Sequence, residues 1–66
     1  MISYNKLWKL LIDKGLTKTQ FRELVGISSA TLAKLSKNQN VTTDTLDSIC
    51  KKLECDISDI AEYKEV

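Results

Sequence analysis

The 66-residue chain has no histidine, two cysteines and two glycines. The absence of histidine removes the side chain that most often acts as a general acid or base near neutral pH. Two separate glycines cannot form a glycine-rich phosphate-binding loop, and no pair of carboxylates stands within an apolar stretch. These absences argue against an enzyme and give no reason to expect a cofactor or a small-molecule ligand.

The two cysteines, Cys50 and Cys55, are too few for a metal centre. A single C-x4-C pair without other soft ligands cannot complete a tetrahedral zinc site, so no metal is expected. Cys50 shares a helical face with Leu46, Ile49 and Leu53, which favours a buried free thiol that packs as a small hydrophobe. A disulfide or a metal-bridged dimer is the alternative.

The sequence also lacks a long hydrophobic run. A membrane-spanning helix needs about 18 or more apolar residues in succession, and the N-terminal segment shows neither such a core nor the small-residue cleavage site of a signal peptide. We therefore expect a cytoplasmic protein without a membrane partner. The composition, 42% hydrophobic and 29% charged, is ordinary for a soluble globular domain, and the length allows one domain over residues 1–66.

The net charge of +1 is small, but the charges are unevenly distributed along the chain. Residues 1–43 carry seven basic and two acidic side chains, a net +5, whereas residues 44–66 carry three basic and seven acidic ones, a net −4. Such a dipolar distribution can orient the basic half toward the phosphates of a nucleic acid. A chance partition of solvated charges is the alternative.

Apolar residues recur at helical spacing in five segments, which predicts an all-α, compact five-helix domain. The expected helices span residues 4–14, 17–25, 29–37, 43–53 and a short segment after residue 56. Their buried faces are expected to carry Leu7, Leu10, Leu11, Ile12, Phe21, Leu24, Val25, Leu32, Leu35, Leu46, Ile49, Leu53, Ile57 and Ile60, with Trp8 alongside. No strand is expected, and residues 64–66 should be frayed.

The stretch from Thr17 to Leu35 reads as two short helices joined by a tight turn. Thr17 is a suitable N-cap, and Gln20 three residues later completes a capping-box pattern. Gly26 follows the first apolar run, where a residue able to take positive φ ends a helix without a steric clash, and Ser28 can cap the second helix. Gly26 is therefore the predicted structural turn of a central helix-turn-helix, a motif that places one helix in the DNA major groove.

Four residues of the second helix of this pair point away from its apolar face, namely Ser29, Ala30, Thr31 and Lys34. Short side chains let a helix backbone approach the floor of the groove, hydroxyls exchange hydrogen bonds with base edges, and a lysine can reach guanine. We predict that these four residues contact DNA bases. An ordinary solvated helix face is the alternative.

Five further residues are predicted to contact DNA phosphates, namely Lys18, Lys37, Asn38, Gln39 and Asn40. Lys18 stands in the first helical turn, where its charge opposes the helix dipole, so an external anion would explain its presence. The amides of the polar loop that follows the third helix hydrogen-bond phosphate as readily as water. Simple solvation of these side chains is the alternative.

The order of these elements, with the words GLTKTQFRELVGIS, SATLAKLSKNQNVTTDTL and ICKKLECDISDI, resembles the Cro/phage-repressor-like helix-turn-helix family of bacterial and phage regulators. The resemblance covers nearly the whole chain. It implies five helices, recognition by the third helix at about residues 29–37, and sequence-specific binding of double-stranded DNA by a homodimer on a two-fold symmetric site. Position by position, it implies the same four base-contacting residues, and phosphate contacts from Lys18 and the loop from Asn38 to Asn40.

Three positions depart from the family pattern. Lys18 stands where the family commonly has glutamine, although a lysine still suits a phosphate. Arg22 stands where the family commonly has a small residue, so its side chain must either extend along the helix pair or shift the crossing of the two helices. Asn38 replaces the loop glycine after the third helix, and asparagine tolerates the left-handed conformation better than most residues.

One alternative function uses the same scaffold without DNA. The acidic C-terminal helices, or the aromatic residues Trp8 and Tyr63 if they are exposed, would then form the surface of a protein-interaction module. Binding to mixed duplex DNA at low salt, where phosphate attraction is strongest, distinguishes the two functions.

Overall fold

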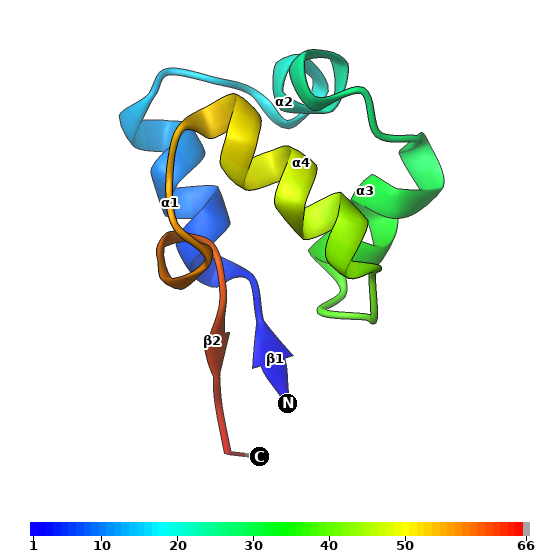
Figure 1. Ribbon diagram of the computed structural model, residues 1–66, viewed down its shortest axis with the longest axis vertical. Helices are drawn as coiled ribbons and strands as arrows, with labels where there is room; N and C mark the ends of the chain where they lie inside the picture. Colours follow the sequence, from blue (N-terminus) through cyan, green and yellow to red (C-terminus); the bar gives the residue numbers. More distant parts are fainter. Residues whose placement is uncertain (66) are drawn as a thin grey trace.

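The computed structural model describes residues 1–65 and is mostly helical (Figure 1). Its elements in chain order are β1 (Ile2–Ser3), α1 (Asn5–Asp13), α2 (Lys18–Val25), α3 (Ser29–Ser36), α4 (Thr43–Leu53), the 3-10 turn η1 (Ile57–Asp59) and β2 (Glu62–Tyr63). The prediction of five helices was wrong. Within the described residues there are four α-helices, and the expected fifth helix is only the single turn η1.

Side-chain caps explain where the helices begin. Thr17 Oγ1 accepts a hydrogen bond from the Gln20 N–H at 3.1 Å, and Gln20 Oε1 accepts one from the Thr17 N–H at 2.9 Å. The predicted capping box is therefore confirmed. Ser28 and Thr42 cap α3 and α4 in a similar way, each through its hydroxyl. Because these groups accept hydrogen bonds from backbone donors that a helix start leaves free, they fix the residue at which each helix begins.

The two-stranded sheet is antiparallel and was not expected from the sequence. Ile2 pairs with Tyr63 and Ser3 with Glu62. Beyond these pairs, the Lys64 N–H donates to the Met1 carbonyl at 2.8 Å, so the prediction that residue 64 is frayed was wrong; residue 66 lies outside the described residues. Strands of two residues are too short to show the alternating pattern by which a strand is recognised in a sequence.

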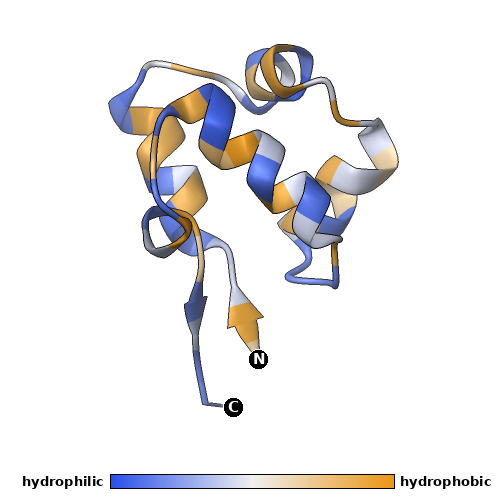
Figure 2. Ribbon diagram, viewed as in Figure 1, coloured by the Kyte–Doolittle hydropathy of each residue, from blue (hydrophilic) through white to orange (hydrophobic). Residues whose placement is uncertain are grey.

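The core takes one fully buried residue from each of five segments. These are Leu7, Phe21, Leu35, Ile49 and Ile60, all with 0% exposure. Figure 2 shows hydrophobic and hydrophilic residues alternating along α1 and α4, as expected of helices that bury one face. The half-buried Trp8 packs edge-on against Phe21, with ring centroids 6.3 Å apart.

Three residues predicted to be buried are exposed instead. Ile12 is 76% exposed, Leu24 45% and Ile57 46%. At 100° per residue, Ile12 lies about 140° from Leu7 around α1 and so faces away from the core. Leu24 and Val25 flank the buried Phe21 on opposite sides of α2, and only the Val25 side is covered. Ile57 begins η1 at the edge of a surface groove described below.

None of the helices within residues 1–65 has both the length and the apolarity that a membrane crossing requires.

Candidate nucleic-acid interface

The turn between α2 and α3 has the geometry that its sequence predicts. Gly26 adopts the left-handed conformation, with φ at +82°, and its N–H donates to the Arg22 carbonyl at 2.8 Å. The Ile27 N–H donates to the same carbonyl at 3.2 Å, and Ile27 packs partly buried against the core. Arg22 itself is half-buried. The turn therefore closes α2 and directs the chain into α3 within three residues.

The outward face of α3 carries the four predicted base-contacting residues. Ser29, Ala30 and Lys34 are exposed, and Thr31 is half-buried. The Ser28 hydroxyl donates to Thr31 Oγ1 at 3.1 Å, which leaves the Thr31 hydroxyl proton free to donate outward. This face can therefore present hydroxyl donors, a methyl group and an ammonium group to a ligand.

A hollow of about 280 Å³ lies between α3 and the start of α4. It is lined by Thr31, Lys34, Asn40, Val41, Thr42 and Thr45. Three of these were predicted to contact DNA. The other three were missed, because local spacing does not reveal that the start of α4 lies beside α3. The T-x-x-T pattern of Thr42 and Thr45 signals a helix cap, but it does not show what that cap faces.

The electrostatic setting of this hollow favours an anion. Its lining includes the basic residue Lys34, and none of the described residues that line it is acidic. The free N–H groups at the start of α4 also add partial positive charge. Asp44 in the first turn of α4 opposes this effect but does not line the hollow.

Lys18 takes a different position from the residues of the hollow. Its ammonium nitrogen lies 4.3 Å from the centroid of the Trp8 ring, within cation–π range. It also lies 3.4 Å from Ser36 Oγ, at the C-terminal end of α3. The structure therefore brings Lys18 to the opposite end of α3 from Ser29, and its predicted phosphate contact is separate from the hollow.

The loop after α3 divides into a structural and an exposed part. Asn38 is half-buried with φ at +55°, so it takes the left-handed conformation expected at this position. Its Oδ1 accepts a hydrogen bond from the Tyr4 N–H at 3.0 Å, which ties the loop to the start of α1. Lys37, Gln39 and Asn40 are exposed. Asn38 thus holds the loop in place, while its three neighbours are accessible to a ligand.

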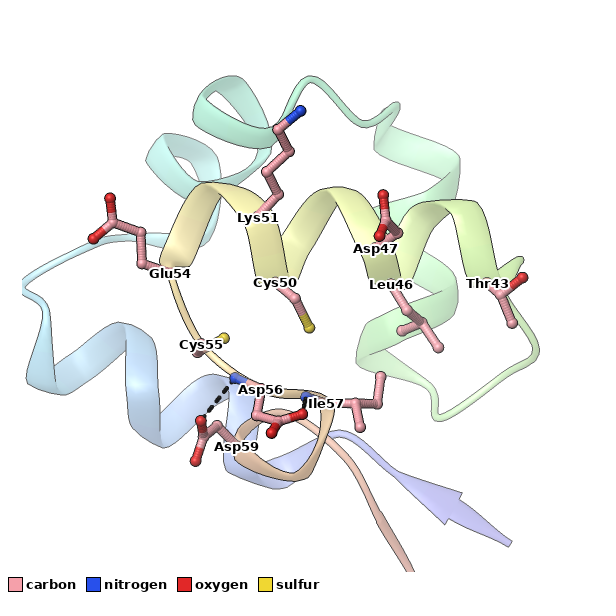
Figure 3. Close-up of a pocket in the computed structure, with 10 residues that line it drawn as sticks. All are labelled: Thr43, Leu46, Asp47, Cys50, Lys51, Glu54, Cys55, Asp56, Ile57 and Asp59. Atoms are coloured by element: carbon pink, nitrogen blue, oxygen red, sulfur yellow. Dashed lines mark hydrogen bonds between the residues drawn. The ribbon is translucent and has the colours of Figure 1, made fainter.

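A second and larger groove, of about 750 Å³, separates α4 from the segment that follows it (Figure 3). It is lined by Thr43, Leu46, Asp47, Cys50, Lys51, Glu54, Cys55, Asp56, Ile57 and Asp59. The side chains of both cysteines point into this space. Four carboxylates line the groove against one ammonium group, so its character is acidic, in contrast to the hollow beside α3.

Both cysteines are free and half-buried, so Cys50 is less buried than the sequence predicted. Helix geometry explains their proximity, because the Cys55 N–H donates to the Cys50 carbonyl at 3.0 Å in the bond that closes α4. Burial, followed by the neighbouring Cys50, raises the pKa of the Cys55 thiol. Within residues 1–65 no group of three or more candidate ligands could hold a metal ion.

The raised pKa predicts slow alkylation of Cys55. Only the thiolate attacks iodoacetamide, and a raised pKa lowers its fraction at pH 8. We expect Cys55 to be carbamidomethylated at least about threefold more slowly in the folded chain than in urea, as followed by mass spectrometry. Equal rates in the two states, after correction for the effect of urea on a free cysteine control, would contradict this expectation.

The fold and the exposed face of α3 define a helix-turn-helix protein. The chain belongs to the Cro/C1-type HTH DNA-binding domain family, whose family model matches residues 6–65.

Two relatives are similar over most of the chain. An uncharacterized HTH-type transcriptional regulator, YozG of Bacillus subtilis (strain 168), is 39% identical over 57 residues, which are 83% of this chain and 68% of the relative. The crystal structure of the transcriptional regulator VanUg, Form II, superposes with a TM-score of 0.90 at 56% identity and covers 92% of this chain and 81% of that one.

Proposed function

We propose that this protein is a small transcriptional regulator that binds double-stranded DNA sequence-specifically, with α3 in the major groove. The observation that carries the proposal is the hollow where Thr31 and Lys34 of α3 meet Asn40 and the capped start of α4. The residues that line the hollow carry hydroxyl, amide and ammonium groups, and none of them is acidic. The family and the two regulators to which the chain is similar support the same function.

The proposal assigns two kinds of contact. Ser29, Ala30, Thr31 and Lys34 meet base edges, because they are the outward residues of the helix that enters the groove. The exposed residues of the following loop, Lys37, Gln39 and Asn40, meet phosphates beside that groove, as does the half-buried Asn38 through its amide nitrogen. Lys18 meets a phosphate at the other end of α3.

The distribution of charge in the fold supports this orientation. Four of the seven acidic side chains of residues 44–66 line the groove beyond α4, namely Asp47, Glu54, Asp56 and Asp59. The basic residues Lys18, Lys34 and Lys37 belong to α2, α3 and the residue after it. The protein can therefore approach the polyanion with its basic side and keep its acidic side in solvent.

We further propose that the protein binds as a homodimer. A single small module buries only about 600–1,000 Å² on DNA, which is a small contact for specific affinity. Two copies related by a two-fold axis would place their α3 helices in successive major grooves, with half-sites about 10 base pairs apart. Footprinting on a site selected from random DNA should then reveal two symmetric halves.

A comparison of two alanine substitutions tests the function. Thr31→Ala should weaken binding to the selected site by about 1 kcal/mol, the lower end of the range for a base contact, because one hydroxyl donor is lost. Discrimination should relax at one base pair. Lys18→Ala should instead weaken binding to all duplexes alike and reduce the slope of log affinity against log salt by about 1, since one phosphate contact is lost.

Both variants are titrated against the selected and a scrambled duplex at several salt concentrations. Lys52→Ala is the matched control, because this exposed lysine lies in the last turn of α4 and lines neither hollow nor groove. Lys52→Ala should change neither the affinity for either duplex nor the slope of log affinity against log salt. If Thr31→Ala and Lys18→Ala behave alike on both duplexes, α3 is not the helix that reads the sequence.

A second candidate function is a protein-interaction module. The acidic groove beyond α4 favours it, because half-buried Leu46 and Cys50 and the exposed Ile57 give that groove an apolar floor and rim. Undetectable binding to mixed duplex DNA at low salt would make this the better account.

A further inference from the structure

The outer edge of β2 has backbone groups that the two-stranded sheet leaves free. The Met1 amino group donates to the Lys64 carbonyl at 2.7 Å, and the Lys64 N–H donates to the Met1 carbonyl at 2.8 Å. Residues 1 and 64 are therefore a hydrogen-bonded pair. Because such pairs alternate with non-hydrogen-bonded ones, Ile2 and Tyr63 form a non-hydrogen-bonded pair. The N–H and C=O of Tyr63 thus point out of the sheet, away from β1.

The same edge carries an exposed apolar face. Ile2 is 47% exposed and Tyr63 71% exposed. As directly paired residues they lie on one face of the sheet, while Ser3, 2% exposed, faces the helices from the other. In Figure 1 the strands extend from the helical body, and β2 has β1 on one side only. A sheet of two short strands with such a face and an open edge is poorly stabilised alone.

The charges beside Tyr63 are self-complementary. Glu62 and Lys64 flank it and lie on the opposite face of the strand, and Glu62 Oε1 is 3.8 Å from Lys64 Nζ. In an antiparallel pairing of this strand with an identical one about Tyr63, Glu62 of each copy stands opposite Lys64 of the other. Those two positions are non-hydrogen-bonded pairs, where side chains approach most closely. Opposite charges there stabilise the pairing.

We propose that a second copy of this chain pairs with the outer edge of β2, about a two-fold axis at Tyr63, and forms a four-stranded sheet in the order β1-β2-β2-β1. Tyr63 exchanges two backbone hydrogen bonds with Tyr63 of the partner subunit. The two tyrosines and the two Ile2 side chains make one continuous apolar face. This interface rests on the dimeric DNA binding proposed above and specifies the surface that forms the dimer.

A charge-swap experiment on the full chain tests the proposal. Glu62→Lys places lysine opposite lysine at both positions of a homodimer, and Lys64→Glu places glutamate opposite glutamate. Each variant alone should therefore show a dimer dissociation constant about tenfold or more above that of the unmodified chain, measured by sedimentation. An equimolar mixture restores both opposite-charge pairs in the heterodimer. The mixture should recover the dissociation constant to within about threefold.

Lys52→Glu is the control, since it makes the same charge change as Lys64→Glu but on α4, away from the sheet, and it should leave self-association unchanged. Circular dichroism confirms that each variant is folded, and recovery upon mixing cannot arise from unfolded chains. Glu62→Lys also loses its 3.9 Å contact with the exposed Lys6, a single surface ion pair that contributes little to folding. Monomeric unmodified protein, unaltered dimers of the single variants, or a mixture that stays monomeric would each overturn the proposal.

Failure of this interface and failure of the proposed function give different results. If the unmodified chain binds the selected DNA while the single variants dimerise normally, DNA binding stands and the β2 interface is wrong. If the charge-swap pattern is observed but no duplex is bound at low salt, the interface stands and the DNA-binding function is wrong.

Discussion

Substitution of Phe21 by alanine is expected to leave little folded protein at room temperature. Phe21 has 0% exposure, packs against Trp8 and belongs to the core shared by all four helices. Removing a buried phenyl ring costs about 3–5 kcal/mol. A chain of this length has a free energy of unfolding of only about 3–10 kcal/mol. The loss is therefore comparable to the whole stability of the domain.

Urea titration followed by circular dichroism measures this effect, with Leu24→Ala as the matched control. Both residues belong to α2, but Leu24 is 45% exposed, so its truncation should cost less than about 1 kcal/mol. If both substitutions lower the free energy of unfolding equally, Phe21 is not more deeply buried than Leu24, contrary to the structure.

The second large effect is expected at the turn. Gly26→Val should lower the free energy of unfolding by about 2–3 kcal/mol, the upper part of the range for a non-glycine residue at positive φ, because valine is β-branched. A Cβ atom at this position would meet no atom within 4 Å beyond the two adjacent residues. The cost is therefore that of the local backbone conformation at φ +82°, not of a clash with a residue elsewhere in the fold.

Gly26→Asn separates these two causes. Asparagine is larger than alanine but tolerates the left-handed region, so it should cost less than valine by about 1 kcal/mol or more. Melting curves of the three proteins provide the comparison. If asparagine and valine destabilise equally, crowding rather than backbone conformation limits this position.

The sequence predicts best those features that depend on neighbouring residues. The Thr17 and Gln20 capping box, the Ser28 cap and the positive φ of Gly26 are local, and all are present. Features that depend on contact between distant segments were missed. Examples are the pairing of Ile2 with Tyr63 and the position of Thr42 beside α3. The exposed Ile12 was misassigned because residue type alone does not tell which side of a helix is covered.

The same limit applies to the candidate site. Outward residues of α3 were identified from helical spacing, and Thr31, Lys34 and Asn40 meet in the hollow. The spacing could not show that Lys18 lies over the Trp8 ring, because that contact joins α1 to α2. The spacing also could not show that Asn38 Oδ1 accepts a hydrogen bond from the Tyr4 N–H.

The pairing of β1 with β2 has a consequence for the order of folding. This pairing closes a loop of about 60 residues, at an entropic cost of about 3–4 kcal/mol. Only a few paired residues contribute hydrogen bonds and contacts that offset this cost. The strands can meet only after the helices have brought residues 2 and 63 close together. Strand pairing is therefore a late step in folding, and the sheet can open in a local equilibrium while the helical core stays intact.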